Sequence, residues 1–333
     1  MLSLREPHYE WGTSELSQIF FQDTILWYNY KMDKIIPPAS VIRKYRGKYL
    51  NNWRQATQNT GRLMLFAGDQ KIEHLNDDFF GTKISLDDAT PAHLFNIASV
   101  ANVGVFAAQL GLIASYGKNY PNIPYLIKLN SKTNLISAKD QDPISLAINT
   151  VEDVWNFKKD SGLNVVGIGY TLYPGSQYES QMLAEASRAI YQAHRLGLLA
   201  VLWIYPRGKS IKDEKDAHLA AGMAGLASCL GADFVKLSYP RAMNKTKMKE
   251  IIMAAGNTGV IFSGGETCEP KQFLCTLAFQ ISNGARGNAT GRNIHQRGLA
   301  EAIRFADAIS AVSLDDYSAE KAYRIYLGKG KLK

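Results

Sequence analysis

Residues 231–239 read GADFVKLSY, and the residues before them, 213–230, have the pattern of an amphipathic helix. The apolar run is typical of a parallel strand that is buried on both faces, and the glycine at the junction is typical of a helix end. Side chains alternate along a strand, so Val235 and Leu237 should face helices while Lys236 faces the other side of the sheet. This stretch therefore predicts one helix–strand unit of an α/β fold.

The same unit recurs along the chain. Amphipathic helices are also expected in residues 176–196 and 270–283, and glycines such as Gly162 and Gly284 lie between a predicted helix and the next strand. The predicted strands cover residues 62–69, 103–109, 125–130, 165–173, 199–205, 234–239, 260–265 and 285–291. Eight strands that alternate with helices predict a closed (β/α)8 TIM barrel, with a doubly wound open sheet as the alternative. The last strand has poor strand propensity and is the weak point of this prediction.

The length of 333 residues exceeds the roughly 250 of a minimal barrel, so one barrel with extensions fits better than two domains. Residues 1–55 are rich in aromatic side chains and are predicted to form an N-terminal helical extension, with one helix from Ser14 to Tyr30. Residues 56–315 form the predicted barrel, and residues 316–333 are predicted to be a C-terminal tail.

Composition is that of a globular protein, with 46% apolar and 20% charged residues. No run approaches the roughly 18 apolar residues of a membrane-spanning helix, and the N-terminus lacks the apolar core of a secretory signal. We therefore expect a cytoplasmic protein without a membrane partner. The three cysteines form no C-x-x-C pair, which argues against a disulfide framework and against a zinc knuckle.

The net charge of +8 raises the question of a nucleic-acid partner. The lysines and arginines are scattered rather than clustered, so we expect none, and a basic surface instead attracts anionic substrates. The six histidines show no H-x-x-x-H or H-x-H spacing, and the pair Glu73-His74 is too short to indicate a site. We therefore expect no metal.

Lys236 is the strongest candidate for chemistry, because it interrupts an apolar strand. A lysine inside a barrel is costly unless it is paired, neutral or functional. Burial lowers the pKa of a lysine, and the neutral amine can attack a ketone to form a Schiff base. The alternative is a structural lysine that reaches the rim or pairs with a carboxylate.

Other polar residues stand at the carboxyl ends of predicted strands, where barrel enzymes place their working groups. Trp203, Tyr205 and Arg207 share one strand face, so Tyr205 could transfer a proton near an iminium and Arg207 could bind a phosphate. A rim aromatic and a surface arginine are the alternative. Asp69 ends the first strand, where it could support the lysine or orient hydroxyls, although aspartates are also common in such turns. Lys128, near the end of the third strand, is a further candidate for substrate or phosphate binding.

Two late glycine-containing turns indicate a phosphate site. They are Ser263-Gly264-Gly265 after the seventh strand and Gly291-Arg292 after the eighth. Barrels frequently bind phosphate with these two loops. Glycine allows backbone N–H groups to approach an anion closely, and Arg292 adds positive charge.

Together these segments resemble the archaeal-type class I fructose-bisphosphate aldolases, also called the DhnA-type family. The resemblance runs in order from about residue 60 to residue 312. It is carried by FAGDQKIEH at 66–74, IKLN at 127–130, WIYPRG at 203–208, GADFVK at 231–236, SGG at 263–265 and GRNI at 291–294. One departure is visible, because many family members have Leu-Asp-His-Gly where this chain has Gly68-Asp69-Gln70-Lys71.

The resemblance implies a metal-independent aldolase that cleaves fructose 1,6-bisphosphate reversibly, with no cofactor and in a homo-oligomer. It implies Lys236 as the Schiff-base lysine, Tyr205 as the proton-transfer residue and Asp69 as the supporting carboxylate. Trp203 would line the substrate channel. The implied phosphate contacts are Arg207, Ser263, Gly264, Gly265, Gly291 and Arg292.

Two alternatives stay open. The first is a related lysine-dependent aldolase or transaldolase-like enzyme that acts on another phosphorylated sugar, such as an aminodideoxyheptulosonate synthase. The second is a basic nucleic-acid-binding barrel without catalysis.

Overall fold

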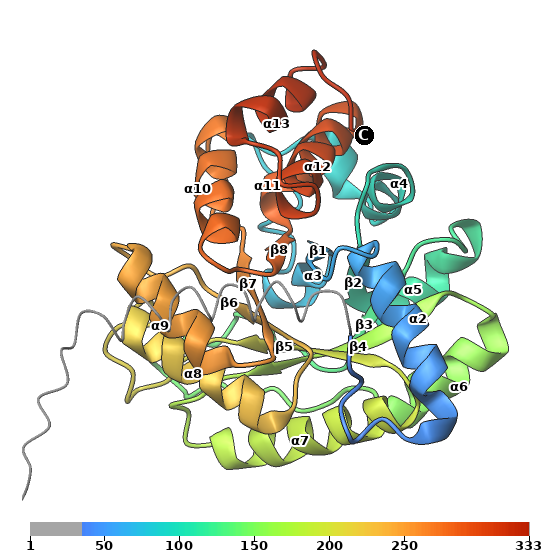
Figure 1. The fold of residues 1–333 in the computed structure, drawn as a ribbon, viewed down its shortest axis with the longest axis vertical. Coiled ribbons are helices and arrows are strands. Elements are labelled where there is room, and N and C mark those ends of the chain that lie inside the picture. Colours follow the sequence, from blue (N-terminus) through green and yellow to red (C-terminus); the bar gives the residue numbers. More distant parts are fainter. Residues whose placement is uncertain (1–34, 333) are drawn as a thin grey trace, which may run out of the picture. The chain divides into compact units, whose positions relative to one another are not determined.

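A computed structural model describes residues 35–332, and within them eight parallel strands close into a barrel in the order β1 to β8 (Figure 1). The strands are β1 Leu63–Ala67, β2 Val105–Gln109, β3 Tyr125–Lys128, β4 Val165–Leu172, β5 Leu199–Ile204, β6 Phe234–Leu237, β7 Gly259–Ser263 and β8 Gly287–Thr290. Seven strands lie within the predicted segments, and β7 begins one residue before its segment. The TIM barrel is therefore confirmed and the open sheet is excluded.

The weakest predicted strand, β8, forms because it is held from both sides. Asn288 of β8 pairs with Met64 of β1 on one side and with Phe262 of β7 on the other. Gly287 has a φ of +122°, and a Cβ there would lie 1.9 Å from the Leu63 carbonyl oxygen. The low strand propensity of this segment thus reflects the close approach of two backbones where the barrel closes.

Helices surround the strands in Figure 1. The α-helices are α2 Arg46–Thr57, α3 Gln70–Glu73, α4 Ala92–Val100, α5 Leu110–Tyr116, α6 Val151–Ser161, α7 Glu179–Arg195, α8 Ala217–Leu230, α9 Lys245–Ala255, α10 Pro270–Ser282, α11 Arg292–His295, α12 Leu299–Ser313 and α13 Ala319–Tyr326. The short 3-10 helices are η1 Arg43–Tyr45, η2 Leu86–Ala89 and η3 Gly117–Asn119.

Local signals explain where these helices begin and end. Asp216 caps α8 by accepting a hydrogen bond from the Leu219 amide, and Gly231 ends α8 in the left-handed conformation. Val235 and Leu237 of the following strand are buried in the apolar layer between sheet and helices. Alternation therefore directs the intervening side chain, Lys236, to the opposite side, as predicted.

Residues 37–57 belong to the same compact unit as the barrel. Helix α2 packs at the amino end of the strands, where Asn52 Nδ2 donates to the Gly197 carbonyl at 2.7 Å and Trp53 stacks on Phe234 at 5.0 Å between ring centroids. The helix predicted from Ser14 to Tyr30 lies outside the described residues. The domain boundary at residue 55 stays a prediction.

The end of the chain contains a helix that the sequence pattern did not predict. In the segment assigned to a C-terminal tail from residue 316, α13 packs against α10 and α12 and buries Ala322 and Ile325. Within residues 35–332, no helix has both the length and the apolar character that a membrane span requires.

Candidate active site

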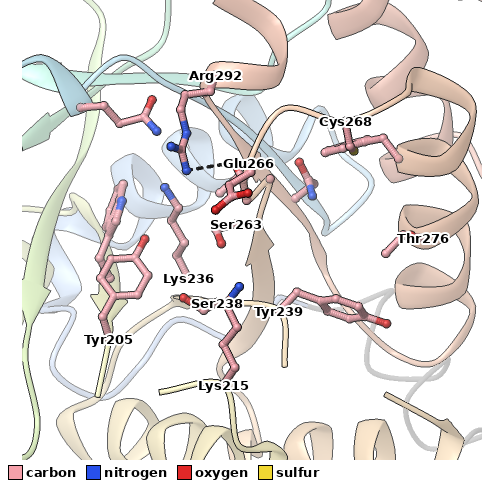
Figure 2. A pocket seen from close by; sticks show the side chains of 18 of the residues that line it. Tyr205, Lys215, Lys236, Ser238, Tyr239, Ser263, Glu266, Cys268, Thr276 and Arg292 are labelled. Atoms are coloured by element: carbon pink, nitrogen blue, oxygen red, sulfur yellow. Dashed lines mark hydrogen bonds between the residues drawn. The ribbon is translucent and has the colours of Figure 1, made fainter. Parts of the chain in front are cut away.

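A cavity of about 420 Å³ opens at the carboxyl ends of the strands (Figure 2). Polar side chains from five strand ends line it, together with glycines of the late loops. The predicted site residues that line this one cavity are Asp69, Trp203, Tyr205, Arg207, Lys236, Ser263, Gly264, Gly265, Gly291 and Arg292. The lining also includes residues to which the sequence analysis gave no role, among them Gln70, Glu73 and Lys215.

Lys236 lies on β6 and is only 4% exposed. Its Nζ lies 5.2 Å from the centre of the Trp203 ring, and within residues 35–332 it makes neither a hydrogen bond nor an ion pair. Burial lowers the pKa of Lys236, the charges of Asp69 and Glu73 oppose this shift, and the charge of Arg292 adds to it. The side chain is therefore a buried amine that reaches its neutral, nucleophilic form more readily than an exposed lysine does.

Lys128 is a second buried lysine beside Trp203, with its Nζ 4.8 Å from the ring centre. In contrast to Lys236, it donates hydrogen bonds to the Asn130 carbonyl at 3.2 Å and to the Thr171 hydroxyl, and it lies 3.8 Å from Asp69 Oδ2. Burial lowers the pKa of Lys128 to about 8. The cavity wall does not include Lys128, so the structure places it behind Asp69.

Asp69 is 8% exposed at the end of β1. One carboxylate oxygen faces Lys128, and the other is buried without a hydrogen-bond partner in the described part of the chain. Leaving a buried acceptor unsatisfied is unfavourable. This oxygen is therefore available to a hydroxyl group of a substrate in the cavity.

Tyr205 follows β5, and its phenol is held in the protonated form. Burial raises its pKa well above the ordinary value, and the charges of Glu73 and Asp69 add to that shift. The charge of Arg207 acts in the opposite direction but is outweighed. Only a further positive charge nearby, such as an iminium at Lys236, would lower the pKa of this phenol.

Arg207 is already paired with two carboxylates. Its guanidinium lies 3.7 Å from Glu73 Oε1 and 3.4 Å from Glu214 Oε1. Glu73 lies on α3, four residues after Asp69, and this spacing places two residues on one helix face. This spacing was the only feature of the sequence that indicated a place for Glu73 beside Asp69. The sequence analysis considered Glu73 only as part of a possible metal site.

The loops after β7 and β8 lie together, as predicted for a phosphate site. Arg292 Nη2 donates to the Gly265 carbonyl at 3.2 Å, and Asn293 Nδ2 donates to the Gly264 carbonyl at 3.0 Å. The Nε of Arg292 is buried without a partner among the described residues. The Gly264 amide already donates to the Ala289 carbonyl at 3.1 Å, so this one backbone donor is used by the barrel itself.

The arrangement can perform one kind of chemistry well. Figure 2 shows the Lys236 and Arg292 side chains pointing toward each other, with Tyr205 beside the lysine. A neutral amine, a protonated phenol and an open carboxylate oxygen can together form and resolve a Schiff base with a carbonyl compound. In the described residues, no group of three or more His, Cys, Asp or Glu side chains is placed to hold a metal ion.

The chain is similar to known aldolases. A family model described as DeoC/LacD family aldolase matches residues 63–297. The fructose-bisphosphate aldolase/6-deoxy-5-ketofructose 1-phosphate synthase of Methanocaldococcus jannaschii is 55% identical over 296 residues, which cover 88% of this chain and 95% of that protein.

Two solved structures agree with this similarity. A fructose-bisphosphate aldolase from Slackia heliotrinireducens has a TM-score of 0.88 and 51% identity, and the match covers 91% of this chain and 96% of that one. An archaeal fructose-1,6-bisphosphate aldolase, whose catalytic lysine is bound to the carbinolamine intermediate of its substrate, has a TM-score of 0.69 and 29% identity, with 80% and 99% covered. The resemblance seen in the sequence is confirmed, and the chain belongs to the DeoC/LacD family of aldolases.

Proposed function

We propose that the chain is a class I fructose-bisphosphate aldolase, which cleaves fructose 1,6-bisphosphate reversibly to dihydroxyacetone phosphate and glyceraldehyde 3-phosphate. The observation that carries this proposal is Lys236, a buried amine with a lowered pKa and no hydrogen-bond partner in residues 35–332. The relatives and the archaeal structure named above support the same reaction. No cofactor is required, because the covalent Schiff base supplies the electron sink.

Lys236 attacks the C2 ketone of the substrate, and the resulting carbinolamine loses water to give an iminium ion. Asp69 accepts the proton of the C4 hydroxyl through its open oxygen, and the C3–C4 bond breaks with its electrons moving toward the iminium nitrogen. Glyceraldehyde 3-phosphate leaves, and an enamine remains on the lysine.

Tyr205 then protonates the enamine at C3, which fits the raised pKa that keeps its proton in place. Addition of water to the restored iminium releases dihydroxyacetone phosphate and regenerates the amine. The phosphate contacts proposed for this cycle come from Arg292, Ser263, Gly265 and Gly291 on the late loops. Trp203 stands beside the lysine as the apolar wall of the channel.

Borohydride trapping tests this proposal. The protein is incubated with dihydroxyacetone phosphate and borohydride, with and without a chelator, and the adduct is located by peptide mass mapping. A chelator-insensitive adduct on Lys236 is expected, together with cleavage of fructose 1,6-bisphosphate in a coupled assay. An adduct on Lys128, or no adduct on any lysine, would reject the assignment.

The two ion pairs of Arg207 favour a second activity. Because Glu73 and Glu214 occupy this arginine, the cavity can accept an aldehyde that brings no second phosphate. The M. jannaschii relative is also named as a 6-deoxy-5-ketofructose 1-phosphate synthase, whose product carries a single phosphate. Incubation with dihydroxyacetone phosphate and 2-oxopropanal should therefore yield this ketose, and its absence would restrict the enzyme to phosphorylated aldehydes.

We also propose a cytoplasmic homo-oligomer that acts in glycolysis or gluconeogenesis and has no nucleic-acid partner. All three cysteines are free thiols, which suits a reducing compartment. Leu135, Ile136 and Ile148, between β3 and α6, expose large apolar side chains of the kind found at subunit contacts. Size-exclusion chromatography with light scattering measures the oligomeric state, and a monomer would contradict this part of the proposal.

A further inference from the structure

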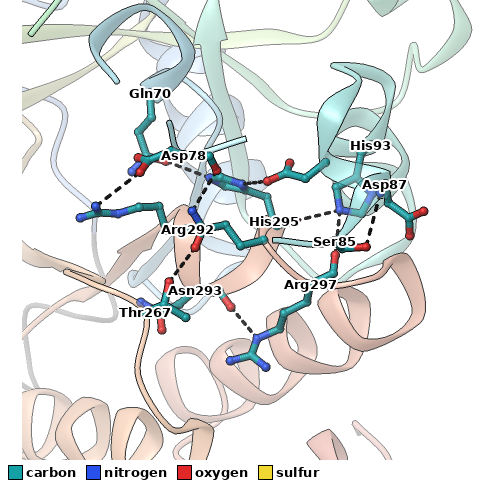
Figure 3. A network of polar contacts seen from close by, with 12 residues as sticks. Gln70, Asp78, Ser85, Asp87, His93, Thr267, Arg292, Asn293, His295 and Arg297 are labelled. Carbon is teal, nitrogen blue, oxygen red and sulfur yellow. Dashed lines mark hydrogen bonds and ion pairs between the residues drawn. The ribbon is translucent and has the colours of Figure 1, made fainter. Parts of the chain in front are cut away.

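A buried carboxylate–imidazole pair lies behind the cavity wall, and the proposed mechanism does not use it (Figure 3). Asp88 and His295 are both 0% exposed, and Asp88 Oδ2 lies 2.6 Å from His295 Nδ1. The Phe79 ring stacks on the imidazole, with centroids 4.8 Å apart and planes 5° from parallel. Packing and hydrogen bonding thus fix the position of the imidazole ring.

The free end of this pair contacts Gln70. His295 Nε2 lies 3.3 Å from Gln70 Oε1. One ring nitrogen of His295 thus contacts Asp88, and the other lies within hydrogen-bonding distance of the Gln70 side chain. The pair therefore connects a buried carboxylate to a side chain on the cavity wall.

Gln70 is held in one orientation at the cavity wall. Its carbonyl oxygen packs so closely on Gly291 that a Cβ at that position would lie 2.0 Å away. With the oxygen facing His295 and Gly291, the amide nitrogen is left without a hydrogen-bond partner in residues 35–332. Gln70 lines the cavity together with Asp69, Gly291 and Arg292. Its amide nitrogen can therefore donate a hydrogen bond to a ligand that binds there.

We propose that Gln70 is a phosphate-binding residue, whose amide nitrogen donates to a phosphate monoester oxygen of the substrate beside Arg292. The Asp88–His295 pair is a positioning device, because it holds the carbonyl oxygen and so turns the donor toward the ligand. This inference rests on the proposed function, since it assigns a contact to the substrate of Lys236. The inference also gives a role to Gln70 at the position where many family members have histidine. Unlike histidine, an amide donates a hydrogen bond without gaining or losing a charge.

The test compares borohydride trapping by dihydroxyacetone phosphate with trapping by unphosphorylated dihydroxyacetone. The ratio of the two half-trapping concentrations measures the preference for phosphate. Gln70→Met keeps the length of the side chain and removes the donor, so the preference should fall about 10-fold, as for a hydrogen bond to a charged group. Gln70→Glu should lower the preference further, because a carboxylate repels the phosphate. Trapping by dihydroxyacetone should change less than about 2-fold in either variant.

Gln192→Met is the matched control, because Gln192 is exposed on α7 away from the cavity. This variant should keep the phosphate preference of the unmodified enzyme. A Gln70→Met enzyme with unchanged preference would overturn the inference, and so would an equal loss for both ketones, which would indicate a structural role. If the unmodified enzyme is trapped by neither ketone, the proposed function itself fails, which is a separate outcome.

Asp88→Asn tests the positioning step with little change of shape. Replacing the carboxylate by an amide weakens the hydrogen bond that fixes the imidazole ring, so Gln70 can turn over and the preference should fall by about 3-fold. In the double variant Asp88→Asn/Gln70→Met, the first change should have no further effect, because it acts only through the glutamine. An additional loss in the double variant would overturn the positioning role while leaving the direct contact of Gln70 intact.

Discussion

The barrel has a buried aspartate–histidine pair at each end, and the two pairs differ in how completely they are satisfied. At the amino end, Asp233 accepts hydrogen bonds from the Tyr49 hydroxyl at 2.5 Å and the Ala200 amide at 2.7 Å, and it contacts His194 Nε2 at 3.1 Å. The other nitrogen of His194 lies 2.7 Å from the Ser40 hydroxyl. This network connects α2, α7 and the start of β6, and it is closed.

At the carboxyl end, the corresponding pair is open. Asp88 Oδ1 is buried without a hydrogen-bond partner in the described residues, and His295 reaches Gln70 on the cavity wall. The same end contains the unpartnered oxygen of Asp69 and the unpartnered Nε of Arg292. Buried polar groups are normally satisfied. Asp69 and Arg292 both line the cavity, so a ligand bound there can supply the partners that their unpaired atoms lack. One end of the barrel therefore stabilises the fold, and the other is arranged for a substrate.

The largest effect is expected when Lys236, the proposed nucleophile, is replaced. Lys236→Met should reduce turnover on the order of 10⁴-fold or more, because no other group forms the Schiff base. Stability should not fall, since a buried amine without a partner is costly. Cleavage kinetics and thermal unfolding measure the two effects. Lys128→Met is the matched control and should still give a borohydride adduct on Lys236; loss of that adduct would contradict the assignment.

Removing the hydroxyl of Tyr205, the proposed proton donor, should have the next largest effect. Tyr205→Phe should lower kcat by about 10²- to 10⁴-fold, the usual contribution of a general acid, with KM changed only a few-fold. Trapping by dihydroxyacetone phosphate should persist, because iminium formation does not need the phenol. A variant that loses affinity and keeps kcat would show that Tyr205 binds substrate rather than transferring a proton.

A mutation in the closed network around Asp233 should lower the stability of the protein and leave its turnover unchanged. Asp233→Ala breaks a buried network and should lower the free energy of unfolding by about 3 kcal/mol, while the kcat of the folded enzyme stays unchanged. Denaturant unfolding and cleavage kinetics provide the two values. Asp316→Ala is the control, because its ion pair with Arg62 is exposed and should contribute less than about 1 kcal/mol. Equal losses in the two variants would remove the distinction between the networks.

The smallest expected effect is the pH dependence of the stability that His194 contributes at the amino end of the barrel. Burial alone would lower the pKa of His194, but the charge and hydrogen bond of Asp233 outweigh it, so the pKa is raised. The unfolded pKa is about 6.5, so this contribution to stability is fully present below that pH and is lost as pH rises through the raised folded value. Urea unfolding of the unmodified protein and of His194→Gln, between pH 5.5 and pH 9, measures it. A stability difference between the two that does not shrink with rising pH would refute this linkage.

Sequence reasoning located the strands and singled out Lys236 for the same physical reason. Buried parallel strands are apolar runs, so both the fold and the lysine that interrupts one run are visible in local sequence. Gln70, Glu73 and α13 were missed because their roles depend on packing between distant segments. Asp88 and His295 are 207 residues apart, and no local pattern shows that they meet. Likewise, only the structure shows that Lys128 is held by partners, because two of them, Thr171 and Asp69, are distant in the sequence.

Trp203 has a consequence that can be observed optically. Its indole lies against the amines of both Lys128 and Lys236, so the electric field at the ring changes when either amine changes charge. Conversion of Lys236 to an iminium should therefore alter the emission of this tryptophan during turnover. The chain contains five tryptophans, and a Trp203→Phe variant would identify its share of the signal. The barrel thus contains its own fluorescent reporter, placed beside the bond that forms.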